Sequence, residues 1–253
     1  MLYRMLLALF TFLVLNLFII SSVPALPLVD VELGGRYWAP APSGDLSYKG
    51  DNLDLENNLD FEREGVPNLY ARAGLAMLML DIHYTRLDYS GKGRNITQET
   101  MFGDINLNDY TDISTDSRLD ILHLGAMFSL PLPVLDLGLG AGVYYLDGKA
   151  EIKANGEKER GSAKVPLPVA KGRLQFSPPG LDLYLSLAGE GLAYSGHSFY
   201  DLRGTLGYSL QDFFLADLRL EGGYRHISID YDQEDLELDT SFSGPFAGLS
   251  LNF

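Results

Sequence analysis

The residues of this chain that could do chemistry are mostly charged side chains, which recur at every second position of short and otherwise apolar segments. In the segment 29–37, Asp30, Glu32 and Arg36 alternate with apolar or small residues. A period of two collects such charges on one face of a β-strand. Acids and bases are nearly balanced on these faces, which favours mutual ion pairing within one network. The predicted network comprises Asp30, Glu32, Arg36, Arg72, Asp81, Asp136, Lys171, Arg173, Asp182, Glu190, Asp201, Arg203, Asp217, Arg219, Glu221 and Arg225.

Serine and histidine residues offer a weaker signal for catalysis. His197 and Ser198 are adjacent and follow a segment that carries Glu190, so a Ser–His–acid set can be assembled on paper. The surrounding residues reproduce no motif of the outer-membrane lipid A deacylases, and the remaining histidines show no pairing diagnostic of the outer-membrane omptin proteases. The sequence therefore predicts no catalytic residue, no cofactor and no metal site.

The charged faces require β-strands, and alternation predicts ten of them. The cleanest segment is 135–145, where leucine, alanine and valine on one face oppose Asp136 and three glycines on the other. These glycines are expected to make room in a crowded interior. Short links alternate with longer segments near 39–66, 90–117, 148–165 and 230–240, as in barrels with short periplasmic turns and longer extracellular loops. The predicted fold is an all-β transmembrane antiparallel β-barrel of ten strands, or of eight if the segments near Leu122 and Ala170 are not strands.

Both ends of the chain predict a position in the outer membrane. Residues 1–25 combine Arg4, an apolar run and small residues before Ala25, which predicts a cleaved secretory signal peptide and a barrel over 26–253. The alternative is a single inner-membrane anchor. The last strand places Leu249, Leu251 and Phe253 on one face, and this ending resembles the terminal strand that the barrel-insertion machinery reads. The predicted location is the outer membrane of a Gram-negative bacterium.

The amino-acid composition limits the molecules that this protein is expected to bind. The chain contains no cysteine and carries a net charge of −15, so disulfides are absent and nucleic acid is not an expected partner. Most of the excess acid lies in the predicted loops, above all in 45–64, which lacks the spacing of a calcium-binding loop. The expected partners are outer-membrane lipid, lipopolysaccharide and the insertion machinery, and the expected oligomeric state is a monomer.

Short stretches at 26–32, 37–38, 48–50, 54–59, 145–148 and 243–245 read LPLVDVE, YW, YKG, DLENNL, YLDG and SGP. Together they resemble an uncharacterised family of Gram-negative outer-membrane β-barrel proteins, and the resemblance spans the mature chain. It implies the barrel and its location, and it supplies no enzymatic motif.

The function predicted from the sequence follows from the charged faces. Basic groups facing lipid cost about 2–4 kcal/mol each near the midplane, so the charges must point into the lumen. A ten-stranded barrel is only slightly wider than an eight-stranded one, whose interior side chains fill. The sequence thus predicts a plugged lumen and a structural or interaction role through acidic external loops. The alternatives are a narrow channel for small solutes and a lipid- or peptide-processing enzyme.

Overall fold

The computed structural model describes residues 29–48, 52–56, 60–93, 100–102, 105–107, 113–132, 134–154, 157–194, 197–213, 216–233 and 236–253. The predicted signal peptide lies outside the described residues. Among the residues that are described, no helix is long and apolar enough to cross a membrane, and this finding has no bearing on crossing by strands.

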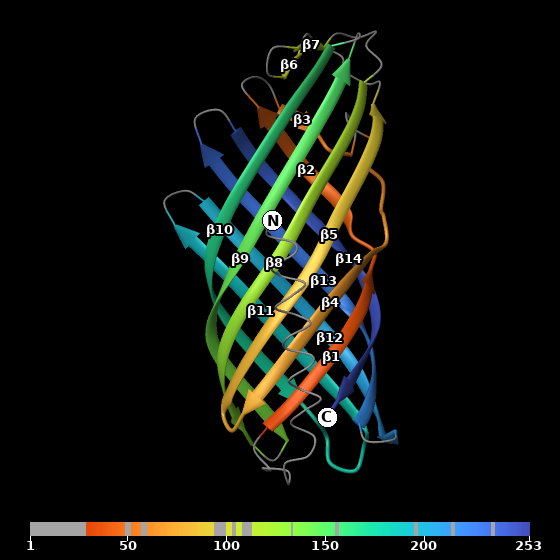
Figure 1. Ribbon diagram of the computed structural model, residues 1–253, viewed down its shortest axis with the longest axis vertical. Helices are drawn as coiled ribbons and strands as arrows, with labels where there is room; N and C mark the ends of the chain where they lie inside the picture. The colour runs from red at the N-terminus through yellow and green to blue at the C-terminus, as the bar shows by residue number, and fades with distance from the viewer. Residues whose placement is uncertain are drawn as a thin grey trace, which may run out of the picture.

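Ten strands form a closed antiparallel barrel, in which each strand pairs with its neighbours in chain order and β1 pairs with β14 (Figure 1). The prediction of ten strands is therefore confirmed. The strands are β1 (Val29–Trp38), β4 (Val66–Leu75), β5 (Leu78–Gly93), β8 (Ile113–Pro131), β9 (Leu135–Ala154), β10 (Glu157–Phe176), β11 (Leu183–Tyr194), β12 (His197–Phe213), β13 (Ala216–Gln233) and β14 (Leu236–Asn252).

Four shorter strands complete the described structure. β2 (Ala41–Tyr48) follows β1 after Ala39 and Pro40, and it replaces β1 as the neighbour of β14. β3 (Asn52–Asp54) pairs with β2, while β6 (Thr100–Phe102) and β7 (Ile105–Leu107) form a separate two-stranded sheet. We call the end where β1 begins and β14 finishes the lower end, and the end that carries β6 and β7 the upper end (Figure 1).

The long loops predicted at the upper end are largely strand. The segment 148–165 is a β-hairpin in which β9 and β10 stay paired up to Ala154 and Glu157. The same holds for 230–240, where β13 and β14 pair up to Gln233 and Leu236. These segments were predicted as loops because their apolar residues no longer lie on the face that is apolar in the lower part of the strand.

The sense of the alternation reverses along each long strand, and β9 shows this clearly. In its lower part the outward residues are apolar, with Leu139 75% exposed. Above Tyr145 the same outward face carries Asp147, Lys149 and Glu151, while the inward Ile152 is fully buried. The lower half is thus apolar outside and polar inside, and the upper half is polar outside and apolar inside.

Exposed tyrosines mark the level at which the reversal occurs. Tyr37, Tyr84, Tyr145, Tyr200 and Tyr224 all face outward on different strands. Aromatic girdles of this kind lie at membrane–water interfaces. The lower half therefore has the surface of a membrane-spanning barrel, and the upper half has the surface of a barrel in water.

Candidate functional site

The predicted network residues line the interior of the lower half. Nine of the sixteen are at least nine-tenths buried: Glu32, Arg36, Asp81, Lys171, Glu190, Asp201, Arg203, Glu221 and Arg225. Arg72, Asp136, Arg173, Asp217 and Arg219 are partly buried. Asp30 and Asp182 are exposed, because both lie close to the lower end, where the barrel opens.

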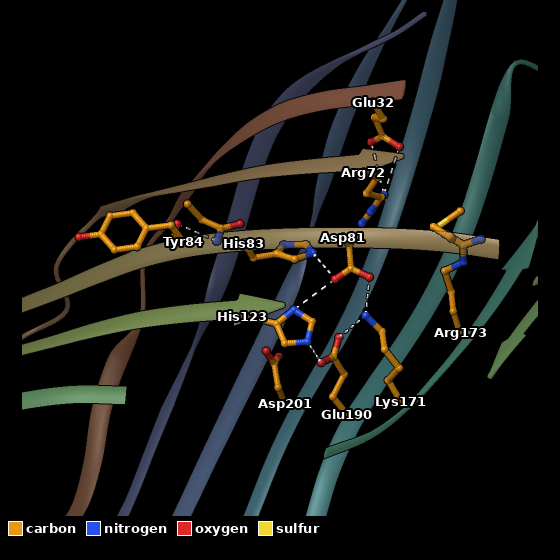
Figure 2. A network of polar contacts seen from close by, with 12 residues as sticks. Glu32, Arg72, Asp81, His83, Tyr84, His123, Lys171, Arg173, Glu190 and Asp201 are labelled. Atoms are coloured by element: carbon orange, nitrogen blue, oxygen red, sulfur yellow. Dashed lines mark hydrogen bonds and ion pairs between the residues drawn. The ribbon is translucent and has the colours of Figure 1, made fainter. Parts of the chain in front are cut away.

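The first group of contacts is centred on Asp81 of β5 (Figure 2). The Lys171 ammonium lies 2.6 Å from Asp81 Oδ1 and 3.4 Å from Glu190 Oε1. His123 joins the same two acids, with Nδ1 3.2 Å from Asp81 Oδ2 and Nε2 2.8 Å from Glu190 Oε2. His83 Nε2 lies 3.3 Å from Asp81 Oδ2. Four strands, β5, β8, β10 and β11, are thereby connected across the interior.

This group does not fit a metal ion, although its donor atoms are close together. Ligand atoms of Asp81, His83 and His123 lie within 4.8 Å of one another. The Lys171 ammonium already pairs with the Asp81 carboxylate. A divalent cation at the same carboxylate would be repelled by that ammonium at short range. The arrangement is that of an ion-pair network.

Glycines give this network its space. A Cβ atom at Gly142 of β9 would lie 2.5 Å from His123 Nε2 and 3.0 Å from the Leu124 carbonyl oxygen. A Cβ atom at Gly125 of β8 would lie 2.8 Å from Asp81 Oδ2. The expectation that inward glycines make room for larger neighbours thus has a direct geometric basis at these two positions.

A second group is centred on Glu221 of β13. Arg36 donates to Glu221 Oε2 at 2.7 Å, and the Tyr184 hydroxyl donates to Oε1 at 2.7 Å. Tyr70 lies between the acids, 3.0 Å from Glu32 Oε1 and 3.2 Å from Glu221 Oε2, and the Arg36 guanidinium lies 4.0 Å from the Tyr70 ring centroid. Every one of these side chains is buried.

A third group closes the charged region at its upper boundary. Arg225 Nη2 donates to Asp201 Oδ2 at 2.6 Å, and the Tyr144 hydroxyl donates to the same oxygen at 2.7 Å. The Arg225 guanidinium lies 4.8 Å from the Trp38 ring centroid. The inward tyrosines that complete these groups were missed because the prediction selected charged residues. Their position on the same strand face as the charges was the available signal.

Above this boundary the interior is apolar and contains a cavity of about 210 Å³. Its lining includes Leu55, Phe61, Leu87, Leu146 and Phe242, which belong to one cluster of buried apolar residues that also contains Trp38. This cavity was not predicted from the sequence, because the upper segments were expected to be loops and one polar face was assigned to the whole lumen.

The Ser–His–acid set considered from the sequence is not assembled. His197 lies 4.9 Å from the Tyr231 ring centroid, and Glu190 contacts His123 and Lys171 instead. Successive strand residues point to opposite faces, so His197 and Ser198 diverge. A different pair is in contact on the outer face, where His226 Nδ1 lies 2.6 Å from Ser243 Oγ.

The outer surface of the upper half carries ion pairs as well. Glu151 lies 2.8 Å from Lys153 Nζ, 2.6 Å from Lys158 Nζ and 2.8 Å from Arg160 Nε. Hydrogen bonds from Lys153, Lys158 and Arg160 lower the pKa of Glu151 to about 2. The hydrogen bond to Glu151 and its negative charge, followed by the charge of Asp116, raise the pKa of Lys153.

No protein-family model matches the sequence, and no curated protein matches it. Solved structures do match. The outer-membrane protease OmpT from Escherichia coli is 10% identical with a TM-score of 0.53, over 92% of this chain and 99% of that chain. The attachment invasion locus protein Ail of Yersinia pestis is 12% identical with a TM-score of 0.39, over 88% of this chain and 99% of that chain. The Pseudomonas putida toluene transporter TodX is 10% identical with a TM-score of 0.32, over 90% of each chain.

These similarities concern the fold alone. The chain is a closed antiparallel barrel, and it shares this fold with the outer-membrane protease OmpT. The matched proteins have different roles, and none of these roles passes to this chain through the fold.

Proposed function

We propose that the protein is a non-conducting outer-membrane β-barrel whose role is structural or interactive, carried by the half of the barrel above the membrane. The observation that carries the proposal is the burial of paired charges across the lower half. An ion-conducting lumen needs a continuous column of water. Arg36 and Glu221 pair with each other instead, and their side chains are only 4% and 2% exposed.

Opening a path through this region would be costly. Displacing one partner of a buried ion pair leaves an uncompensated charge, and such losses cost about 3–5 kcal/mol. The three groups would have to move together, because ring contacts join them: Tyr70 with His83 at 5.5 Å and His123 with Tyr144 at 4.4 Å between ring centroids. The network therefore supports a closed interior that stiffens the barrel and anchors the upper half.

Single-channel recording in a planar bilayer tests this proposal. Wild-type protein shown to be inserted should give no stepwise openings. The double variant Arg36→Ala with Glu221→Ala removes a complete pair without leaving a charge unpaired, and it should produce measurable conductance. The matched control, Asp147→Ala with Lys164→Ala, removes a pair on the outer surface at 3.0 Å and should stay silent. Regular openings of the wild type would contradict the proposal and favour a narrow solute channel.

The proposed partners follow from the outward faces. Exposed leucines in the lower half and the tyrosine girdle support contact with outer-membrane lipid and lipopolysaccharide. The terminal strand presents Leu249 and Phe253, 53% and 58% exposed, to the insertion machinery, with Leu251 partly buried between them. Closure of β14 on β1 within one chain supports a monomer, and removal of residues 1–25 would accompany export. Deleting Phe253 should lower the amount of assembled barrel in the outer membrane without changing synthesis.

One observation favours a second candidate, hydrolysis of an acyl ester at the outer surface. Ser243 and His226 are in contact and lie beside Leu202 and Tyr224, which are 52% exposed each, at the level of the girdle. A serine hydroxyl bonded to an imidazole is an arrangement for nucleophilic attack. No carboxylate among the described residues lies within ion-pair distance of His226. A fluorophosphonate probe should label the wild type and Ser241→Ala but not Ser243→Ala if this candidate is correct.

A further inference from the structure

The upper half of the barrel contains an apolar cavity, and its size limits what could occupy it. The cavity measures about 210 Å³. A cavity of about 150 Å³ accepts benzene, and drug-sized pockets begin at about 300 Å³. By proportion the space suits roughly eight to ten non-hydrogen atoms.

The walls come from opposite sides of the barrel. Leu87 of β5, Leu119 of β8 and Leu146 of β9 line one side. Ile229 of β13 and Phe242 of β14 line the other, with Leu55 and Phe61 from the segment between β3 and β4. An uncharged, mostly hydrocarbon occupant matches this lining, because burial of its apolar surface is favourable and it leaves no charge unpaired.

Two buried hydroxyl groups in the lining favour an occupant that carries a polar atom. Thr115 and Thr240 both line the cavity, are 1% and 3% exposed, and have side-chain oxygens without a hydrogen-bond partner. Thr115 lies on β8 and Thr240 on β14, on opposite walls. A buried hydroxyl without a partner is unfavourable by about 1–3 kcal/mol, so a polar atom on the occupant would relieve that cost.

We propose that the upper half binds a small, uncharged amphiphile, with an apolar ring or short chain in the cavity and one hydroxyl or carbonyl group bonded to Thr115 or Thr240. The binding site is independent of the closed lumen proposed above, since a barrel that conducts could still hold this occupant.

Trp38 allows a direct test, because it is the only tryptophan in the sequence and belongs to the same apolar cluster as seven of the lining residues. The full mature chain would be folded into lipid nanodiscs and titrated with 4-bromophenol, whose bromine quenches nearby indole fluorescence. Quenching should saturate in the wild type. Quencher dissolved in lipid gives only a linear component, because Trp38 is 1% exposed inside the barrel.

Gly161 provides the variant that fills the cavity. It lines the space, and a Cβ atom added there meets nothing within 4 Å, so Gly161→Leu should fold and occupy the cavity. The saturable component should weaken at least tenfold in this variant. Lys164→Leu adds the same side chain on the opposite, exposed face of β10, outside the cavity lining, and should bind as the wild type does. Linear quenching in the wild type, or an unchanged binding constant in Gly161→Leu, would overturn the site.

The role of the two threonine hydroxyls is tested by comparing two probes that differ in one hydroxyl group. Bromobenzene lacks the hydroxyl of 4-bromophenol and should bind about 2- to 10-fold more weakly, the loss of one neutral hydrogen bond. Thr115→Val or Thr240→Val should remove this preference while keeping saturation, because valine preserves the shape of the side chain. Equal affinity for the two probes in the wild type would refute the role of the hydroxyls.

Discussion

Replacing Tyr144 by phenylalanine removes one hydroxyl from the boundary between the two halves of the lumen. That hydroxyl donates to Asp201 Oδ2 at 2.7 Å, and both residues are 2% exposed. The ring contacts remain possible in the variant, with His123 and Phe199 at centroid distances of 4.4 and 4.6 Å. The substitution thus isolates a single buried hydrogen bond to a charged group.

The expected loss of stability follows from the charge of the acceptor, the Asp201 carboxylate. Hydrogen bonds to charged groups contribute about 1.5–3 kcal/mol, and Asp201 keeps its contact with Arg225, so no charge is left without a partner. We expect Tyr144→Phe to lower the free energy of unfolding by about 2 kcal/mol. With an m value of about 2 kcal/mol/M, the urea midpoint of folding into phospholipid vesicles should fall by about 1 M.

The neighbouring tyrosine is the matched control. Tyr145 is 36% exposed on the outward face, so Tyr145→Phe should change stability by no more than about 0.5 kcal/mol. The two variants make the same chemical change at adjacent residues on opposite faces of β9. Equal losses, or a larger loss at Tyr145, would refute the assignment of faces on which the network rests.

Two further outcomes are expected from the same structure. Gly142→Ala should destabilise the barrel by about 1–3 kcal/mol, because its Cβ would meet His123 Nε2 and a backbone carbonyl, whereas Gly161→Ala should be neutral or slightly stabilising in the same urea assay. A carboxyl ¹³C titration should give Glu151 a pKa of about 2, and Lys153→Met should raise it. Since the folded-state pKa of Glu151 lies below its ordinary 4.5, its contribution to stability is present above pH 4.5 and is lost as the pH falls towards 2. A Glu151 titration midpoint near 4.5 in the wild type would contradict the ion-pair geometry.

The strand count could be predicted from the sequence because the membrane-spanning part of each strand alternates strictly. Leu137, Leu139 and Val143 face outward in β9 as their spacing indicates, and Lys171 and Glu190 face inward on their own strands. Which inward charges would pair could not be predicted. Pairing between Asp81 and Lys171, separated by 90 residues, depends on the angular positions of β5 and β10 around the barrel.

The upper half escaped prediction for a different reason. Ile152 and Leu146 are apolar at even positions of β9, whereas the lower part of the strand is apolar at odd positions. An alternation pattern with apolar residues at odd positions, applied to the whole strand, identifies only its lower part. A search for a change of parity along a single strand would have identified the hairpin 148–165 and the apolar residues around the cavity.

The reversal follows from the change of solvent along the barrel. In the membrane, lipid offers no penalty to outward leucine, so the interior is free to hold polar groups provided that they satisfy one another. Above the girdle, water surrounds the strands, and burial of apolar side chains again becomes favourable by about 25 cal/mol per Å². The barrel therefore needs a polar interior below Tyr145 and an apolar one above it. An apolar cavity therefore suits the upper half, and a buried network of ion pairs suits the lower half.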